Sequence, residues 1–97
     1  MLVFLTEEAR QDVKAAASYY GQLRNRYGNT FDEELEAGLN RVADYPERAP
    51  KFGQRFRRLK LRRFPYGILY GEDSGRIIVT AVMHLRRRPA AWNKRQT

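Results

Sequence analysis

His84 is the only histidine in the sequence, and histidine is the side chain whose ordinary pKa lies near neutrality. It precedes Arg86, Arg87 and Arg88, which could hold a phosphate. The pattern permits a general base that activates an RNA 2′-hydroxyl, with Arg86 or Arg88 stabilising the phosphorane. The simpler interpretation is that His84 ends a strand and bonds backbone or solvent. We favour it, because a lone histidine without an evident partner is weak evidence for catalysis.

A second group of bases alternates along one short segment. Arg58, Lys60 and Arg62 lie two residues apart, so they share one face if the segment is a β-strand. Such a row is commonly a solvated face, but together with residues 86–88 it makes a positive field that could contact a target. Acidic residues concentrate before Glu47, and the formal charge of the chain is +8. The sequence therefore predicts an acidic partner: nucleic acid, an acidic protein or both in turn.

The elements that position these bases begin with a strand and a helix. Leu2 to Leu5 form a continuous apolar run, typical of a buried strand. Thr6 is suited to cap a helix, with Glu7 and Glu8 in the first turn, where the helix dipole favours negative charge. The inward face of this helix follows three- and four-residue steps: Ala9, Val13, Ala16, Ala17, Tyr20, Leu23 and Tyr27. Gly28 is expected to end the helix.

A second helix is predicted after a link of only Gly28 and Asn29. Thr30 and Glu33 form a capping box at its start. Pro46 sets its end near residue 45, because proline cannot donate to the helix and disfavours helical geometry in the residue before it. Its apolar stripe comprises Phe31, Leu35, Leu39 and Val42. So short a link predicts an antiparallel helical hairpin.

After residues 46–52 the spacing of apolar residues changes from that of a helix to that of a strand. Strands are expected at 56–62, 66–70 and 76–85, and the last, apolar on both faces, is expected at the centre of the sheet. Tyr66 and Tyr70 could stack on bases, but at strand positions they are expected in the core. The fold class is therefore α+β: an N-terminal strand, an antiparallel helical hairpin, a three-stranded antiparallel sheet and a short basic C-terminal tail, in a single domain spanning 1–97.

Composition excludes several classes of protein. With 42% apolar and 12% aromatic residues, the chain is globular rather than disordered. The absence of cysteine excludes disulfides, zinc thiolate sites and thiol nucleophiles, and no metal or other cofactor is expected. The apolar start ends at Thr6, too early for a signal peptide, and no stretch is long enough to span a membrane. We expect a soluble cytoplasmic protein.

Two segments together carry a family resemblance. The first runs from Arg57 to Tyr70 (RRLKLRRFPYGILY), and the second from His84 to Trp92 (HLRRRPAAW). With the early alanine-rich helix, they resemble the ParE-type branch of the RelE/ParE toxins, also known as plasmid stabilisation proteins. The resemblance implies a growth inhibitor encoded beside an acidic antitoxin that neutralises it by wrapping it. It associates ParE-type members with poisoning DNA gyrase and RelE-type members with cutting messenger RNA on the ribosome.

Individual positions favour the ParE-type branch. The resemblance implies that a RelE-type nuclease would place an arginine at Gly67 and a tyrosine at Trp92. An indole cannot act as a general acid or base. Lys60 retains one of the expected strand bases, Arg58 could replace another, and Arg86 can stand for the tail arginine. His84, Arg86 and Lys60 are therefore only weak catalytic candidates, and we expect a non-enzymatic gyrase inhibitor, with a ribosome-dependent endoribonuclease or a basic nucleic-acid-binding module as the alternatives.

The binding surfaces can also be predicted. The predicted target contacts are Arg58, Lys60, Arg62, Arg86, Arg87, Arg88 and Trp92. Trp92 would otherwise pin the tail to the body of the protein, and this anchoring is the favoured interpretation. Tyr19 and Tyr20 are adjacent on a helix and cannot both face inward, so at least one is expected at the helix–sheet edge, where an antitoxin segment could dock. The chain would act as a homodimer or as a hetero-oligomer with the antitoxin.

Overall fold

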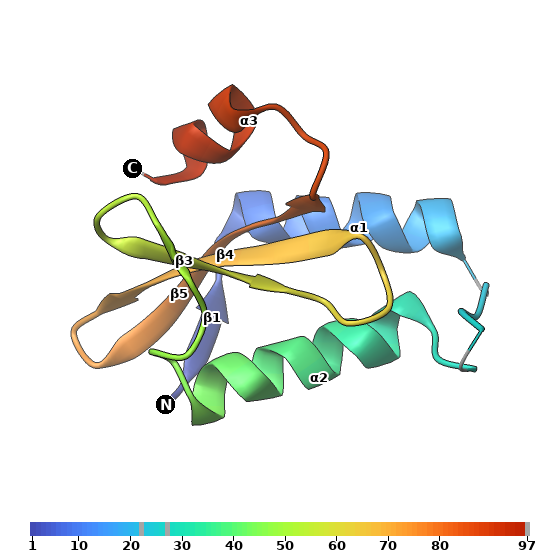
Figure 1. The fold of residues 1–97 in the computed structure, drawn as a ribbon, viewed down its shortest axis with the longest axis horizontal. Coiled ribbons are helices and arrows are strands. Elements are labelled where there is room, and N and C mark those ends of the chain that lie inside the picture. The colour runs from blue at the N-terminus through green and yellow to red at the C-terminus, as the bar shows by residue number, and fades with distance from the viewer. Residues whose placement is uncertain (22, 27, 97) are drawn as a thin grey trace.

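Within residues 1–21, 23–26 and 28–96, which the structure describes, the computed structural model contains a five-stranded mixed sheet (Figure 1). Its order is β1 (Val3–Leu5), β5 (Arg76–His84), β4 (Tyr66–Asp73), β3 (Phe56–Lys60) and β2 (Lys51–Phe52). β1 runs parallel to β5, and the other neighbours are antiparallel. This confirms the α+β class.

The predicted three-stranded sheet was too small. β1 joins it because Val3 and Leu5 lie opposite Ile77 and Val79 and pack half-buried side chains against the core on the helix side. β2 lies within the segment predicted to be a loop, where its residues pair with the start of β3. β4, rather than β5, is therefore the middle strand, while β5 lies between β1 and β4 and is buried on both faces.

α1 (Glu7–Tyr20) is shorter than predicted. Thr6 caps it as expected, and its side chain accepts a hydrogen bond from the Ala9 N–H at 3.1 Å. The helix ends at Gly21, whose φ of 56° lies in the left-handed region that glycine adopts without strain. Leu23 is consequently 64% exposed rather than on the inward stripe. Tyr27, predicted on the same stripe, lies outside the described residues.

α2 (Phe31–Asp44) begins with the predicted capping box, in which both hydrogen bonds between Thr30 and Glu33 are present. α1 and α2 run antiparallel, as Figure 1 shows. The link between them is residues 21–30 rather than a Gly-Asn pair, because Gly21 ends α1 a full two turns before Gly28. The hairpin is thus confirmed, with a longer connection than predicted.

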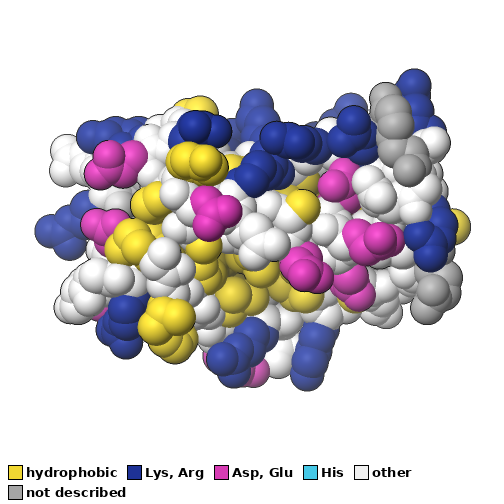
Figure 2. All heavy atoms as spheres, turned by 90° about the horizontal axis from the view of Figure 1, so that it is seen from below, with side chains coloured by type: hydrophobic (Ala, Val, Ile, Leu, Met, Phe, Trp, Pro, Cys, Tyr) yellow, Lys and Arg dark blue, Asp and Glu magenta, His cyan; other side chains and the backbone are white. Residues whose placement is uncertain are grey.

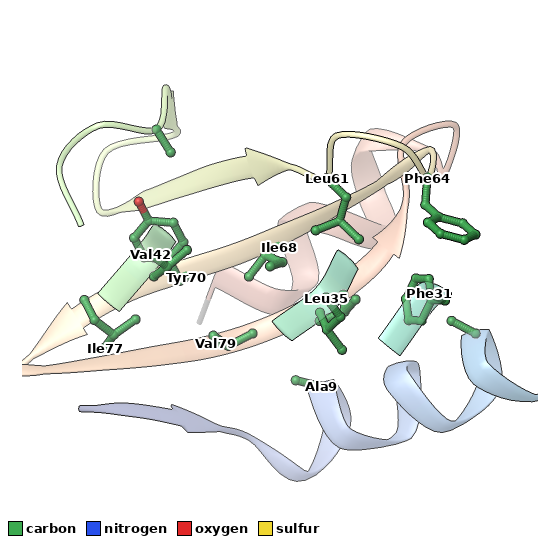
Figure 3. Packing of buried hydrophobic residues seen from close by; sticks show 13 residues of the cluster. Ala9, Phe31, Leu35, Val42, Leu61, Phe64, Ile68, Tyr70, Ile77 and Val79 are labelled. Atoms are coloured by element: carbon green, nitrogen blue, oxygen red, sulfur yellow. The ribbon is translucent and has the colours of Figure 1, made fainter. Parts of the chain in front are cut away.

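The larger core lies between the two helices and the sheet (Figure 3). Phe31, Leu35 and Val42 of α2 meet Ile68 and Tyr70 of β4, all fully or nearly fully buried. This agrees with the expectation that Tyr70 is a core residue. At about 25 cal/mol per Å² of buried apolar area, contacts of this kind supply the main favourable term in folding.

A smaller core lies on the opposite face of the sheet. It comprises Leu69, Ala81, Met83 and Trp92, with Phe52, Phe56 and Ala91 packed against it. Trp92 reaches this face from α3 (Pro89–Asn93), which continues into a 3₁₀ turn, η1 (Lys94–Gln96). The segment predicted to be a basic tail is therefore helical, because Pro89 is well placed at a helix start and Trp92 supplies an apolar anchor.

Candidate functional site

The three bases predicted on one strand face, Arg58, Lys60 and Arg62, have different surroundings in the structure. Arg58 projects toward the smaller core, where its guanidinium lies 4.7 Å from the centre of the Phe52 ring and 5.0 Å from the Trp92 ring. Cation–π contacts of this kind hold an arginine in place. Lys60 and Arg62 are exposed, and both line a pocket between β3 and α2. The structure therefore brings Arg58 together with Trp92, and leaves Lys60 and Arg62 to face a potential ligand.

Gly67 is buried and lies opposite Lys60 in the sheet, with the side chain of Arg58 close to its Cα atom. A Cβ atom added there would lie 3.0 Å from Leu85 Cδ2 and 3.2 Å from the Cγ and Cδ atoms of Arg58. These contacts are tighter than ordinary packing, so any larger side chain would have to displace Leu85 or Arg58. The side chains of Leu85 and Arg58 therefore fill the space beside Gly67, the position at which the RelE-type pattern has an arginine.

His84 ends β5, and its ring contacts the Tyr66 ring edge-on at a centroid distance of 5.5 Å. Its Nδ1 accepts a hydrogen bond from the backbone N–H of Arg86 at 3.0 Å. In the neutral imidazole this assigns the proton to Nε2 and occupies the Nδ1 lone pair. A base would need a free lone pair, so this geometry matches the interpretation of His84 as a strand-end residue that bonds backbone.

The three consecutive arginines follow β5 and lead into α3. Arg86, Arg87 and Arg88 are all exposed. They line a shallow hollow of about 420 Å³ together with Ala90, Ala91 and Lys94. Arg87 donates its backbone N–H to the His84 carbonyl at 3.0 Å, which turns the chain away from the sheet. The arrangement is an open cationic surface, which suits contact with a large acidic partner better than enclosure of a small substrate.

Trp92 is 1% exposed and therefore anchors α3, which was the favoured interpretation. Its ring packs at 5.9 Å from that of Phe52. Its Nε1 is buried without a hydrogen-bond partner among the described residues. Burial removes Trp92 from the surface offered to a target, so the predicted target contact has no support in this conformation.

Tyr19 and Tyr20 divide as predicted for adjacent helical positions. Tyr20 is half-buried and stacks on Phe31 at a centroid distance of 5.6 Å, with Phe64 and Tyr66 edge-on to it. Tyr19 is 79% exposed at the end of α1. Burial is the largest of the causes that raise the pKa of Tyr20 and Tyr66. Of the two, Tyr19 offers an aromatic surface to a partner.

An apolar hollow lies on the side of the molecule nearest α2. Figure 2 shows hydrophobic side chains gathered in it, with charged side chains along its margins. Half-buried apolar residues on the helix side of the sheet include Val3, Leu5, Val13 and Leu39. Exposed apolar area of this kind, rimmed by charge, is typical of protein-binding surfaces.

Sequence reasoning did not predict the ion pair between Asp12 and Arg95. Their side chains approach to 2.6 Å and are only 13% and 18% exposed. The signal was the position of Asp12 in the helix, beside the inward residues Ala9, Val13 and Ala16, where an unpaired carboxylate would be costly. The partner could not be predicted because it lies on η1, far along the chain.

The described residues contain no group of three or more histidine, aspartate and glutamate side chains that could hold a metal ion. In the same ranges, no helix is both long enough and apolar enough to cross a bilayer.

Comparison with known proteins adds the family. The chain matches a family model described as "ParE toxin of type II toxin-antitoxin system, parDE" over residues 3–89. It is similar to a solved structure titled "Chromosomal ParDE TA system from P. aeruginosa", with a TM-score of 0.70, 16% sequence identity and coverage of 87% of this chain and 95% of that one. At this identity the likeness shows the fold. A comparison with curated proteins gives no match. Because the family model spans most of the sequence, the chain belongs to the ParE toxin family of type II toxin–antitoxin systems.

Proposed function

We propose that this chain inhibits growth by binding DNA gyrase, without cutting RNA, and that an acidic antitoxin neutralises it. The observation that carries the choice of target is the packing around Gly67. Gly67 supplies no side chain where the resemblance places a RelE-type arginine, and the Leu85 and Arg58 side chains would have to move to admit one. An RNA phosphate would consequently lack one of the bases that the nuclease branch uses to stabilise it.

The surroundings of His84 support the same proposal. A ribonuclease needs a group that accepts a proton and another that donates one. The Nδ1 atom of His84 is already occupied by the Arg86 N–H, and Trp92 is buried and carries an indole where the nuclease branch has a tyrosine. An inhibitor that works by occupying a surface needs neither group. The exposed arginines at 86–88 would then supply charge complementarity to an acidic region of the target.

An acidic antitoxin fits the two kinds of surface that this chain presents. The solved structure to which this chain is similar is titled "Chromosomal ParDE TA system from P. aeruginosa". The formal charge of +8 favours fast encounter with an acidic protein, and the apolar hollow of Figure 2 with the exposed Tyr19 offers area for an amphipathic segment. Complex formation would stabilise the toxin by mass action. In this proposal, binding to the antitoxin and binding to gyrase both take place in the cytoplasm.

The test is to induce the toxin in cells with and without the neighbouring acidic reading frame. We expect growth arrest without that frame and recovery with it. Plasmid supercoiling should change after induction, whereas primer extension on mRNA should show no new cleavage at ribosome-bound sites. Cleaved mRNA with normal supercoiling would refute the gyrase proposal in favour of the endoribonuclease. Normal growth would refute both and leave a basic binding module.

A further inference from the structure

A basic pocket of about 480 Å³ lies between the C-terminal half of α2 and the outer edge of β3. Its lining is Arg41, Tyr45, Arg48, Ala49, Pro50, Arg58, Leu59, Lys60 and Arg62. Five of these nine residues are bases and none is acidic, although the guanidinium of Arg58 itself lies against Phe52 and Trp92 in the smaller core. Arg41, Tyr45 and Arg48 were not among the residues singled out in the sequence, because they lie on α2 and the loop after it. The fold therefore adds charge from a second element to the predicted row on β3.

The charge of this pocket is not balanced within the described part of the chain. Arg41, Arg48, Lys60 and Arg62 are absent from the ion pairs formed there. The Nε atom of Arg41 is buried and has no hydrogen-bond partner among those residues. Burial lowers the pKa of Arg41 and the nearby charge of Arg62 lowers it further, although Glu34 acts in the opposite direction. Because Arg41 is partly buried and has the like charge of Arg62 nearby, an anion in this pocket would stabilise it.

The pocket also contains an open strand edge. The Leu61 N–H donates to Tyr66 on the β4 side, so the backbone groups of Leu59 and Leu61 face β4. Those of Arg58 and Lys60 face outward. The Arg58 N–H donates to the Pro50 carbonyl at 3.1 Å, but β2 pairs only with Phe56 and Arg57. The N–H and C=O of Lys60 therefore point past the end of β2 into the pocket, where another strand could pair with them.

We infer that this pocket binds an extended acidic segment of the antitoxin, which pairs with the Lys60 edge and places its carboxylates against Arg41 and Arg62. The inference rests on the antitoxin proposed above. Alternate residues of a strand share a face and lie about 7 Å apart, so a segment with acidic residues at every second position presents a row of carboxylates to the bases. Guanidinium groups pair with carboxylates through two parallel hydrogen bonds.

A peptide fits this pocket better than a nucleic acid. The free donor and acceptor of Lys60 match the backbone of a strand, and they have no counterpart in a phosphodiester chain. Binding of a single-stranded nucleic acid usually adds bases stacked on aromatic rings. The aromatic ring here is Tyr45, and the Arg48 guanidinium covers one face of it at 4.0 Å.

The test uses purified toxin and a fluorescein-labelled seven-residue peptide of alternating glutamate and valine, with binding followed by fluorescence anisotropy. We expect saturable binding that the double variant Arg41→Gln, Arg62→Gln weakens at least about tenfold. The matched control is Arg10→Gln, Lys14→Gln, which removes the same charge from exposed positions on α1 and should change the affinity less than about twofold. Equal weakening by both double variants would overturn the inference, since it would show attraction to net charge alone.

Two further probes test the strand edge and the nature of the ligand. Methylating alternate amide nitrogens of the peptide removes the donors needed for pairing and should abolish binding to the wild-type protein, so this arm does not depend on the folding of a variant. Unchanged affinity of the methylated peptide would contradict edge pairing.

The second probe is a single-stranded oligonucleotide. If it binds more tightly than the peptide and the Arg41→Gln, Arg62→Gln variant loses that binding, the pocket is assigned to nucleic acid instead. If the peptide does not bind while the antitoxin still neutralises the toxin in cells, this inference alone is overturned. If induction of the toxin causes no growth arrest, the proposed function is overturned.

Discussion

Arg95 and Asp12 form a two-point ion pair, with 2.6 Å between Nη1 and Oδ2 and 3.1 Å between Nη2 and Oδ1. The same carboxylate accepts a hydrogen bond from the Val82 N–H, and Arg95 also donates to the Thr80 carbonyl. Both backbone groups lie on the stretch of β5 beyond its pairing with β1. The pair therefore joins α1, η1 and the part of β5 that β1 leaves unpaired.

Asp12→Asn should lower the free energy of unfolding by about 3 kcal/mol, because it leaves a largely buried guanidinium without its carboxylate. Urea denaturation followed by circular dichroism measures the loss. The control is Glu8→Gln, since Glu8 lies 3.7 Å from Arg95 but is 72% exposed. That variant should cost less than about 1 kcal/mol. Equal losses would show that the Asp12 pair contributes no more than a surface contact.

Gly38→Ala should destabilise the protein, although alanine is the better helix former. A Cβ atom at this position would lie 2.7 Å from Leu61 Cδ2 and 3.0 Å from Ile68 Cδ1. The gain in helix propensity is at most about 1 kcal/mol, whereas overpacking a core costs about 1 to 3 kcal/mol. We expect a net loss in thermal unfolding, and a loss in the double variant with Leu61→Ala that is smaller than the sum of the two single losses, because the shorter side chain removes the clash. A gain in stability would mean that α2 can move away from the sheet at little cost.

The stability should fall at alkaline pH because of buried tyrosines. Tyr70 is 2% exposed and donates its hydroxyl to the Pro46 carbonyl at 2.6 Å. Burial raises its pKa, so the unfolded chain loses this proton first as pH rises. Its contribution is full below about pH 10 and is lost as pH rises through the folded-state pKa. Urea denaturation at a series of pH values should show a shallower alkaline decline for Tyr70→Phe than for the wild type, while Tyr19→Phe, at an exposed position, should keep the wild-type slope.

His84→Ala should remain toxic, whereas the triple variant Arg86→Glu, Arg87→Glu, Arg88→Glu should not. Loss of a general base lowers the rate of a chemical step by roughly a hundredfold or more, but an inhibitor needs no proton transfer. Reversing three exposed charges weakens binding through lost complementarity and new repulsion. Growth after induction is the measurement, with circular dichroism to establish that both variants fold. Loss of toxicity in folded His84→Ala would support a chemical role for the imidazole.

Local signals predicted the helices and strands well. The Thr30–Glu33 capping box and the alternation on β3 act through neighbouring residues, and both are present in the structure. The end of α1 was mispredicted because the apolar spacing continues past Gly21, whose backbone conformation outweighs it. The β1–β5 pairing and the Arg41–Arg62 pocket could not be predicted, since they join segments that only the fold brings together. Of the predicted site, Lys60, Arg62 and residues 86–88 face solvent, and Arg58 and Trp92 pack against each other.

The parallel pairing of β1 with β5 has a consequence for the order of folding. Val3 lies opposite Ile77, so the first strand has no place in the sheet until the fifth strand has been synthesised. Contacts between such distant segments slow folding, because the loop between them must close before they stabilise anything. The Arg95–Asp12 pair closes a second long loop, because it joins α1 to η1 near the end of the sequence. A partly synthesised chain therefore lacks the native surface, and the complete binding surface is assembled only late in synthesis.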